Sequence, residues 1–590
     1  MPHGNDSHSI EKPREGRKTL RRLLSYLTRD WKLLTFIGFL IIISIFSNLL
    51  GSYMLRPVIN NYILPGNITG LAQVLIILAL IYIVGVVATL IEYRLLNKIG
   101  QDTVAELRSE LFSKMETLPI KYFDTHQTGD LMSRYTNDID KISEVLTDSL
   151  ADLLSSLLTF IGIFCLMIYI SPVLTLITLI TVPLMILSAN LIAKKSRKYF
   201  KAQQNSLGEV NGYIEEIISG QKVIKVFNHE EKSEADFDKL NQDLNNKSGK
   251  AQLYSGMMMP VMQNLSTLNF VVVTIAGALL AIFRGFDIGG LAAFLQYSRQ
   301  FGRPIIDLSS LYNNIQSAIA GAERIFQIID KQPEPEDDAN ATVLHNIQGD
   351  IKLEDVHFGY TPDTTVLKGI TFEVKADTKI ALVGATGAGK TTILNMLPRF
   401  YDIQSGEITI DNIPLKNIKL SSLRQSMAIV LQDTHLFTGT VRENIRFGRL
   451  DATDEEVMDA ARLTAAHSFI KRLPNGYDTL LENDGANLSQ GQRQLLNIAR
   501  AAIANPPILL LDEATSNIDT RSEILIQKGL DKLMQGRTSL IIAHRLSTVR
   551  NADIIMVLDY GKIVETGTHE QLIAKKGFYY NLYQNQFEEI

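Results

Sequence analysis

The chain has 590 residues, of which 46% are hydrophobic and 21% are charged, and its formal net charge at pH 7 is -5. Its length indicates more than one domain. The chain is too apolar to be disordered and too charged to be buried wholly in lipid, so we expect a membrane part joined to a soluble part. The mild acidity gives no indication of nucleic-acid binding, and the single cysteine, Cys165, excludes an intrachain disulfide.

The start of the chain is polar. The first apolar run begins near Leu33, whereas a secretory signal would place a short apolar core close to Met1. We therefore predict that residues 1–18 are a disordered tail. A short amphipathic helix on the membrane surface is expected next, because four leucines recur at helical spacing beside arginines: Leu20, Leu23, Leu24 and Leu27. The alternative is a cytoplasmic extension of the first membrane span.

Six long apolar stretches follow, and they place a transmembrane domain at residues 19–330. Each is close to the roughly 20 residues that a helix needs to cross a bilayer. The stretches are Leu33–Leu55, Leu71–Ile91, Leu146–Ile170, Val173–Ala193, Pro260–Phe283 and Ile288–Tyr312. The last is the weakest by hydropathy because it carries several polar residues: Gln296, Arg299, Gln300, Arg303 and Asp307.

Basic residues alternate between the connections of these stretches. Lysine and arginine are abundant before the first span, between the second and third, and between the fourth and fifth, and they are sparse in the other connections. Positive loops face the cytoplasm, so both termini and the soluble part are expected there, with the chain in the cytoplasmic membrane. The basic connections lack strong turn signals, which predicts membrane helices that continue deep into the cytoplasm.

The sixth stretch carries a polar face. Arg299, Arg303 and Asp307 are spaced four residues apart and therefore share one side of a helix. Charged groups against lipid are costly, so this face is expected to line the bundle interior or a water-filled cavity. Two interpretations stay open: the face lines the path of the transported substrate, or an Arg303–Asp307 pair simply snorkels near a helix end.

A linker rich in proline and acidic residues occupies positions 331–345. Beyond it, short β-rich runs alternate with helical patterns, which predicts an α/β domain over residues 346–590. The predicted fold is thus a six-span α-helical membrane domain followed by an α/β domain.

The strongest motif of the α/β domain is the run Gly384–Thr391, Gly-Ala-Thr-Gly-Ala-Gly-Lys-Thr. It follows the apolar strand Ile380–Val383 and precedes a helix-forming run, as a phosphate-binding loop requires. Its glycines let backbone N–H groups close on phosphates, Lys390 can reach the β- and γ-phosphates, and Thr391 can hold Mg²⁺. The expected nucleotide contacts of this loop are Thr386, Gly387, Ala388, Gly389, Lys390, Thr391 and Thr392.

A second motif is the apolar strand Ile508–Leu511, which ends in two acids. Asp512 is placed to orient Mg²⁺ and its water. Glu513 follows directly, where a carboxylate can polarise the attacking water. The alternative, two acids that cap the next helix, does not account for the phosphate loop upstream.

Together with further motifs in the same order, these features resemble the ATP-binding cassette (ABC) exporters over nearly the whole chain. Leu488–Gln492 resembles the family signature, and Ser516–Asp519 resembles the loop that crosses the dimer interface. Tyr122-Phe123-Asp124 with Thr128-Gly129-Asp130 resembles the stretch that leads into the first coupling helix. Four single residues also match family positions. Gln432 matches the glutamine that joins Mg²⁺ to the membrane-domain contact, and His544 matches the switch histidine. Tyr360 matches the aromatic residue that stacks on adenine, and Val366 would lie near that ring.

The resemblance implies a half-transporter that works as a dimer with ATP and Mg²⁺. Glu513 and His544 would be catalytic, Thr391, Gln432 and Asp512 would hold the metal, and the signature would contact the partner's ATP. The signature contacts are Ser489, Gly491 and Gln492. The implied function is ATP-driven efflux of amphipathic small molecules (multidrug) or lipids by alternating access, with a lipid flippase or an ATP-gated regulatory or channel subunit as the alternative.

One signature residue departs from the family pattern, because Gln490 stands where glycine is usual. This combination resembles the competent subunit of bacterial heterodimeric exporters, so a second, different half-transporter is the expected partner, and a homodimer is the alternative. The stretch Thr479–Gly485 also departs from the pattern.

An importer is disfavoured by the fusion of both domains in one chain, and a soluble ATPase is disfavoured by the spans. Membrane lipid and an amphipathic cargo are the other expected partners, without nucleic acid.

Overall fold

A computed structural model describes residues 15–361, 363–512, 520–543 and 546–587. The chain divides into two compact units. The first unit comprises Met1–Thr117 and His126–Lys331, and the second comprises Leu118–Thr125 and Gln332–Ile590. The short segment Leu118–Thr125 therefore groups by its contacts with the second unit, although the chain on either side of it belongs to the first.

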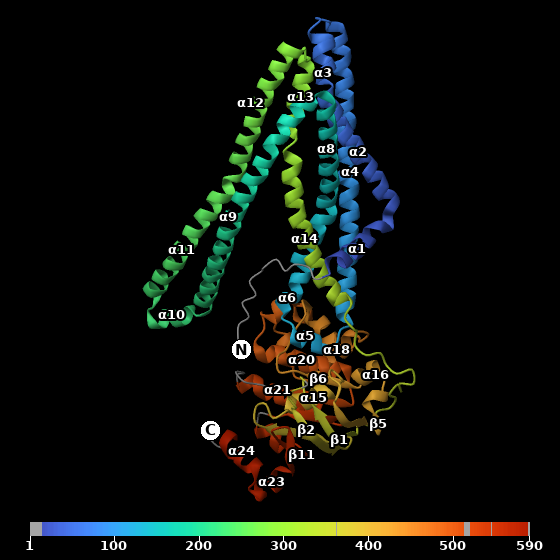
Figure 1. The fold of residues 1–590 in the computed structure, drawn as a ribbon. Coiled ribbons are helices and arrows are strands. Elements are labelled where there is room, and N and C mark those ends of the chain that lie inside the picture. Colours follow the sequence, from blue (N-terminus) through green and yellow to red (C-terminus); the bar gives the residue numbers. More distant parts are fainter. Residues whose placement is uncertain (1–14, 362, 513–519, 544–545, 588–590) are drawn as a thin grey trace. The chain divides into compact units, whose positions relative to one another are not determined.

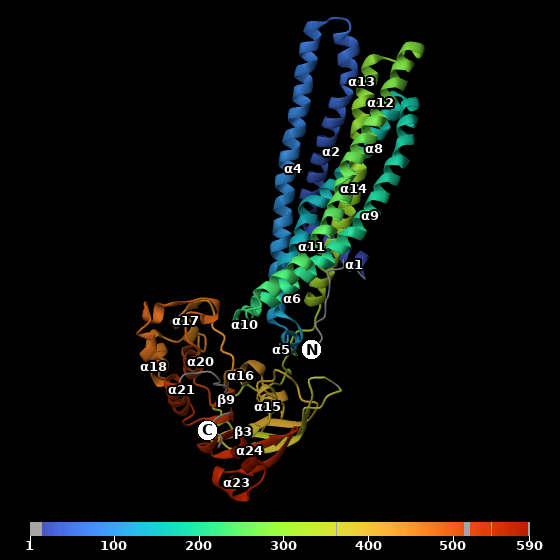
Figure 2. The ribbon, with the colours of Figure 1, turned by 90° about the vertical axis from the view of Figure 1, so that its left-hand side faces the viewer.

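The first unit is helical (Figure 1). Its helices are α1 (Gly16–Leu27), α2 (Trp31–Tyr53), α3 (Leu55–Pro57), α4 (Ile68–Glu116), α6 (Thr128–Ser133), α7 (Ile139–Glu144), α8 (Leu150–Ile170), α9 (Pro172–Ser219), α10 (Gln221–Phe227), α11 (Glu230–Gly256), α12 (Met258–Arg284), α13 (Ile288–Gln300) and α14 (Arg303–Ile329). Figure 2 shows α2 and α4 running alongside each other, and these two helices are in contact.

The predicted amphipathic helix is α1, and it begins at Gly16, before the predicted end of the disordered tail at residue 18. Residues 1–14 lie outside the described residues. Of the four predicted leucines, Leu23 and Leu27 are buried by protein, Leu20 is half-buried and Leu24 is exposed, so part of this face packs against protein. Arg22 bonds to the carboxylate of Asp330 at 2.7 Å, which ties α1 to the end of α14.

Five helical stretches of the described chain are long and apolar enough to cross a membrane. They are Gly16–Ile63, Ile68–Glu116, Thr128–Ile170, Pro172–Ser219 and Glu230–Arg284. The predicted count of six is therefore not confirmed. The sixth predicted span is divided into α13 and α14 at Phe301 and Gly302. Pro304 lacks the N–H that would bond to the carbonyl of Gln300, so the helical ladder is interrupted there.

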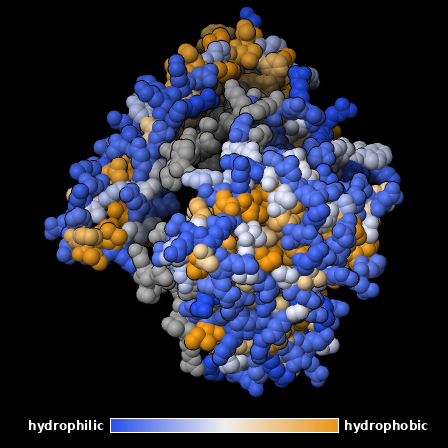
Figure 3. Space-filling model, turned by 90° about the horizontal axis from the view of Figure 1, so that it is seen from below, coloured by the Kyte–Doolittle hydropathy of each residue, from blue (hydrophilic) through white to orange (hydrophobic). Residues whose placement is uncertain are grey.

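Three of the long helices form an arm in which α9 packs against α11 and α12 (Figures 1 and 2). The helices continue well past bilayer length, as the missing turn signals predicted; α9 alone has 48 residues. The short helix α10 turns the chain at the end of the arm and is closed by Asn228 in a left-handed conformation. Its apolar side chains Val223, Val226 and Phe227 are exposed, and Figure 3 shows apolar atoms at this end, at the left of the view.

The second unit is built on β-sheets, as the alternating pattern predicted. A six-stranded sheet has the order β12-β11-β3-β10-β9-β6, in which only β12 is antiparallel to its neighbour. A four-stranded antiparallel sheet has the order β2-β1-β4-β5, and β7 pairs with β8. The strands are β1 (Ile351–Phe358), β2 (Leu367–Val374), β3 (Lys379–Gly384), β4 (Ser405–Ile410), β5 (Ile413–Pro414), β6 (Met427–Val430), β7 (Gly439–Thr440), β8 (Leu480–Leu481), β9 (Ile508–Asp512), β10 (Thr538–Ile542), β11 (Ile554–Asp559) and β12 (Lys562–Gly567).

The helices of this unit pack around its sheets and complete the hydrophobic cores that bury the mostly aliphatic strands. They are α15 (Lys390–Met396), α16 (Leu420–Gln425), α17 (Val441–Arg446), α18 (Asp454–Leu463), α19 (His467–Ile470), α20 (Gln490–Ala504), α21 (Thr520–Leu533), α22 (Leu546–Arg550), α23 (His569–Lys575) and α24 (Phe578–Phe587). This unit also contains α5 (Ile120–Thr125). The predicted linker lies on the unit's surface, where Glu334 pairs with Arg424 at 2.6 Å and Asp337 accepts from the Leu420 N–H at 2.9 Å.

Candidate nucleotide-binding site

The predicted motifs converge on one edge of the six-stranded sheet. Strands β3, β10, β9 and β6 are parallel neighbours, so their carboxyl ends meet at the same edge. The phosphate loop leaves β3 at Gly384, Asp512 ends β9, and Gln432 follows β6 by two residues. In open α/β sheets, ligands bind outside the carboxyl ends of the strands. The structure thus brings together three motifs that lie far apart in the sequence.

The phosphate loop depends on backbone conformations that favour glycine. Gly387 and Gly389 have φ values of +84° and +102°, in the region that L-residues rarely adopt. A Cβ atom at Gly389 would also come within 2.8 Å of the Leu367 side chain. Thr386 and Gly387 are exposed, whereas Ala388 is buried. The loop therefore leaves backbone groups close to the space where a phosphate would lie.

Lys390 is buried at the start of α15. Its ammonium donates to the carbonyls of Gly384 at 2.8 Å and Ala385 at 3.0 Å. Burial lowers the pKa of Lys390, and the nearby Asp512 carboxylate opposes that shift. A phosphate group beside the ammonium would stabilise the charged form further. The lysine is thus held at the loop by weak acceptors that a phosphate can replace.

The residues present fit a magnesium ion that is shared with a nucleotide. Thr391 and Gln432 are exposed and Asp512 is half-buried. In the described part of the chain, no group of three His, Cys, Asp or Glu residues could hold a metal ion by itself. The site offers one hydroxyl, one amide and one carboxylate, and Mg²⁺ prefers oxygen ligands with its remaining positions filled by phosphates and water.

An aromatic cluster surrounds the predicted adenine platform. The Tyr360 ring lies edge-to-face against Phe358 and against Tyr401, with ring centroids 5.0 Å apart in both pairs. The Tyr360 hydroxyl shares a hydrogen bond of 3.2 Å with the Thr392 hydroxyl, next to the phosphate loop. Tyr360 keeps 36% of its surface exposed, and Val366 is half-buried. The platform is therefore fixed by its neighbours and still accessible to a base.

Tyr401 was not predicted as a site residue. Its hydroxyl donates to the carboxylate of Asp124 in α5. Burial, followed by this contact, raises the pKa of Tyr401, so the hydroxyl stays protonated and remains a donor at neutral pH. The sequence signal that could have indicated it is the run Phe400-Tyr401-Asp402, a pair of aromatic residues closely following α15.

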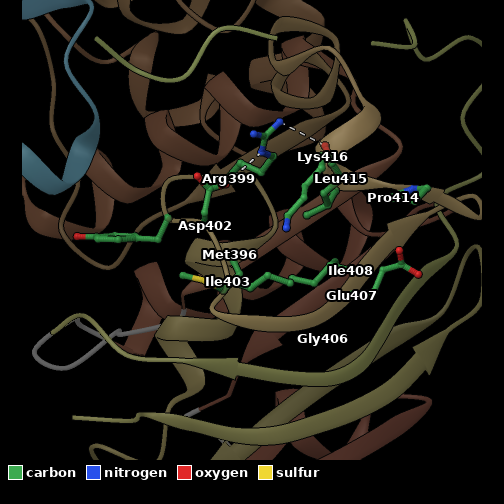
Figure 4. Close-up of a pocket in the computed structure, with 11 residues that line it drawn as sticks. Met396, Arg399, Asp402, Ile403, Gly406, Glu407, Ile408, Pro414, Leu415 and Lys416 are labelled. Atoms are coloured by element: carbon green, nitrogen blue, oxygen red, sulfur yellow. Dashed lines mark hydrogen bonds and ion pairs between the residues drawn. The ribbon is translucent and has the colours of Figure 1, made fainter. Parts of the chain in front are cut away.

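A pocket lies beside this cluster, at the end of α15 and along β4 (Figure 4). Arg399 spans it, paired with Asp402 at 3.6 Å and with the Leu415 carbonyl at 3.4 Å. The remaining polar lining includes Glu407 and Lys416. None of the predicted nucleotide contacts lines this pocket, so it is not the nucleotide site.

The signature forms the start of α20. The Ser489 hydroxyl accepts from the Gln492 N–H at 3.3 Å, and the Gln492 side chain accepts from the Ser489 N–H at 2.9 Å, which closes a capping box. Gln490 is the first residue of the helix and is exposed, while Gly491 is buried. The side chain of Gln490 is therefore displayed at the helix start, outside the core.

The stretch Thr479–Gly485 also has a defined conformation. It contains β8, and Asp484 adopts a left-handed conformation with φ of +61°. The Asp484 carboxylate accepts from the Leu436 N–H at 2.7 Å. This bond fixes the stretch to the segment that follows Gln432.

Several predicted residues lie outside the described residues: Glu513, Ser516–Asp519 and His544. Glu513 follows the last residue of β9, and His544 lies two positions after the end of β10. Their catalytic and interface roles stay predictions.

The predicted polar face of the sixth span divides in the first unit. Arg303 and Asp307 are 3.8 Å apart. Arg299 has a different neighbour, because its guanidinium lies 4.1 Å from the centre of the Phe270 ring in α12. Arg299 therefore contacts α12, whereas Arg303 and Asp307 contact each other within α14. The role of the three residues in a substrate path stays a prediction.

Comparison with known proteins identifies the family. Residues 34–305 match the family model "ABC transporter transmembrane region", and residues 367–516 match the model "ABC transporter". The chain is 46% identical over 578 residues to the "Uncharacterized ABC transporter ATP-binding protein YfiC" of Bacillus subtilis, covering 98% of this chain and 96% of that protein. A solved bacterial Atm1-family ABC exporter matches with a TM-score of 0.73 and 27% identity, covering 95% of this chain and 99% of that one. The chain is an ABC exporter half-transporter.

Two other relatives of this exporter are named for lipid substrates. A "Fatty acid ABC transporter ATP-binding/permease protein" of Mycobacterium bovis is 41% identical, with 88% of this chain and 83% of that protein covered. An "ATP-dependent lipid A-core flippase" of Syntrophus aciditrophicus is 37% identical, with 91% and 89% covered. The half-transporter is thus a multi-pass membrane protein of a type that functions as a dimer, and its second unit is an ATP-binding ATPase coupled to transport.

Replacement of Tyr360 by Ala is expected to raise the ATP concentration needed for half-maximal ATPase by about fivefold to a hundredfold. The reason is that stacking of a base on an aromatic ring is worth roughly 1–3 kcal/mol. The maximal rate should change less than the ATP requirement, because the ring does not touch the phosphates. ATPase measured over a range of ATP concentrations tests this, and an unchanged ATP dependence contradicts the role.

Proposed function

We propose that this exporter uses ATP to move amphipathic molecules, lipids foremost and hydrophobic drugs as the alternative, out of the cytoplasmic membrane. The observation that carries the proposal is the convergence of the phosphate loop, Asp512 and Gln432 at one sheet edge of a chain that also holds five membrane-length helices. The lipid preference is supported by the names of the two lipid-specific relatives. The basic connections support an orientation with both termini and the ATPase in the cytoplasm.

In this proposal each site residue has a separate task. Lys390 exchanges its loop carbonyls for the β- and γ-phosphates, and Tyr360 holds the base. Thr391, Gln432 and Asp512 hold Mg²⁺, which neutralises phosphate charge when it is bound. Glu513 accepts a hydrogen bond from the attacking water and acts as the general base that removes a proton from that water. His544 contacts the γ-phosphate. The two catalytic assignments rest on sequence position after β9 and β10.

The site is proposed to be completed by a second half-transporter. The capped start of α20 displays Ser489 and Gln490, as expected for a surface that meets the partner's ATP. Exposed apolar groups support such assembly, namely the α10 side chains and the tilted ring pair Phe437 and Phe447, whose centroids are 4.6 Å apart. Gln490 favours a different half-transporter as the partner, with a homodimer as the alternative.

Reconstitution of the chain into lipid vesicles tests the function and the partner together. We expect ATP-dependent movement of a fluorescent phospholipid or fatty acid, with less movement of a cationic dye, and none in Glu513→Gln vesicles. Activity of the chain alone would establish a homodimer, and activity only after addition of a second half-transporter would establish a heterodimer. ATP hydrolysis without movement of any probe in both preparations would contradict an exporter and favour a regulatory or channel subunit.

The polar groups around α13 and α14 are proposed to contribute to the substrate path. Changing Arg299 to Ala should alter the stimulation of ATPase by lipid or the range of transported probes, because its guanidinium lies over the Phe270 ring of α12. Arg299→Lys keeps the charge and should retain more of the stimulation. Arg303→Ala should act in the same direction, while basal ATPase and assembly are retained. If both Ala variants transport every probe like the parent, the residues are structural only.

A further inference from the structure

A chain of contacts runs from the predicted adenine platform to α5. The Tyr360 ring contacts the Tyr401 ring at nearly a right angle, 89° between planes. Tyr401 is 9% exposed and also contacts Phe358, with centroids 5.7 Å apart. Its hydroxyl donates to the Asp124 carboxylate, which lies 277 residues earlier in the sequence. One buried side chain therefore contacts both the platform and α5.

The helix α5 lies in a segment that connects the two units of the chain. The segment Leu118–Thr125 groups with the ATPase unit, while the chain before Leu118 and after Thr125 belongs to the membrane unit. Any displacement of α5 is therefore passed on covalently to α4 on one side and to α6 on the other. The hydrogen bond between Tyr401 and Asp124 is one contact that holds this segment against the ATPase unit.

The segment that follows α5 is itself fastened to α14. Arg134 bonds to Asp130 at 2.9 Å and to Asp138 at 3.2 Å. Asp138 is only 2% exposed and also accepts from the Arg324 guanidinium. A buried carboxylate between two arginines is costly to separate, so α6 and α14 are expected to move together. These contacts provide a route by which displacement of α5 would reach α14.

We propose that Tyr401 is a positioning residue that links occupancy of the adenine platform to the placement of α5. Its ring supports Tyr360, and its hydroxyl holds Asp124. This inference rests on the proposed binding of adenine by Tyr360. A base stacked on Tyr360 restricts that ring, the restricted ring limits the motion of Tyr401, and the Asp124 contact passes the restriction to α5. The two parts of one side chain thus have separable effects.

Separate substitutions distinguish the ring from the hydroxyl. Tyr401→Ala removes the support of Tyr360 and should raise the ATP requirement about 2- to 10-fold, since an edge-to-face ring pair is worth about 0.5–1.5 kcal/mol. Tyr401→Phe keeps the ring and should leave the ATP requirement unchanged. It should instead reduce the lipid stimulation of ATPase. A merely structural role would change the ATP requirement in both variants or in neither.

Amide hydrogen exchange of α5 provides a measurement that needs no transported cargo. The full-length Glu513→Gln protein in lipid nanodiscs is compared with and without ATP. We expect ATP to slow amide exchange in residues 118–125 of this parent. This slowing should be largely lost when Tyr401→Phe or Asp124→Ala is introduced into the same protein. Asp124→Asn keeps an acceptor oxygen and should retain part of the slowing. Tyr477→Phe is the matched control, because it removes a tyrosine hydroxyl bonded to His467 at 2.7 Å, away from α5.

Two further measurements distinguish a failure of the proposed link from a failure of the proposed ATP site: the double variant of Tyr401 and Asp124, and amide exchange in the phosphate loop, residues 384–391. If the contact acts as a pair, Tyr401→Phe combined with Asp124→Ala should be no worse than either single change. If ATP slows amide exchange in α5 equally in the Tyr401→Phe variant and in the parent, while residues 384–391 are still protected by ATP, the proposed link through Tyr401 is wrong but the ATP site stands. Loss of protection at residues 384–391 in the parent itself would instead overturn the proposed ATP site.

Discussion

Replacement of Lys390 by Ala should lower ATP hydrolysis by about 10²- to 10³-fold, the usual cost of losing one charged donor aimed at reacting oxygens. ATP affinity should fall as well, because the ammonium is the buried cation of the phosphate loop. Its present partners are the neutral carbonyls of Gly384 and Ala385, so a phosphate is the stronger acceptor. ATPase and equilibrium binding of a fluorescent ATP analogue measure the two effects.

Two further variants separate this effect from a loss of folding. Lys390→Met keeps most of the buried volume and should be as inactive as Lys390→Ala. Lys416→Ala removes an exposed lysine beside the pocket at β4 and should keep full ATPase. A thermal unfolding temperature near that of the parent shows that the fold is intact. Retention of tight ATP binding in both Lys390 variants would contradict the assignment.

Replacement of Glu513 by Gln should lower hydrolysis by about 10²- to 10⁴-fold, the usual contribution of a general base. ATP binding should be retained. Asp512 ends β9 near Lys390 of the phosphate loop, and its proposed task is to orient the metal. Glu513 is one residue farther along, where it can act on the attacking water with little contribution to phosphate binding. Single-turnover hydrolysis and ATP binding should therefore separate in this variant.

The matched comparison is Asp512→Asn, which removes a proposed metal ligand. Its ATPase should be partly restored by higher Mg²⁺, whereas that of Glu513→Gln should not respond to Mg²⁺. If Glu513→Gln loses ATP affinity as severely as Lys390→Ala, then Glu513 is a binding residue and not the base.

The phosphate loop and the long apolar helices were predictable because their signals are local. A strand, a glycine-rich turn and a helix follow one another without interruption from β3 to α15, so neighbouring residues suffice to define the motif. Apolar runs of bilayer length likewise need no knowledge of their neighbours. The division of the sixth span is also marked locally, by Pro304, a signal that the prediction of this span did not use.

Periodicity indicated the amphipathic helix α1 but not what its apolar face contacts. Leu23 and Leu27 pack against protein, whereas Leu24 is exposed; protein and lipid surroundings favour the same spacing of leucines. In the same way, a spacing of four placed Arg299, Arg303 and Asp307 on one face. Which side chains they meet depends on how the helices pack: Arg299 lies over Phe270 of α12, whereas Arg303 and Asp307 pair with each other.

The sequence by itself determined the class of chemistry: which residues can bind phosphate and metal, and that they belong to a membrane protein. Only the tertiary structure decided which distant residues meet. The strand order β3-β10-β9-β6 brings Gly384, Asp512 and Gln432 to one edge, and Tyr401 meets Asp124 across 277 residues of sequence. Such contacts leave no local periodicity, because they are selected by the packing of whole elements and not by the spacing of neighbouring side chains.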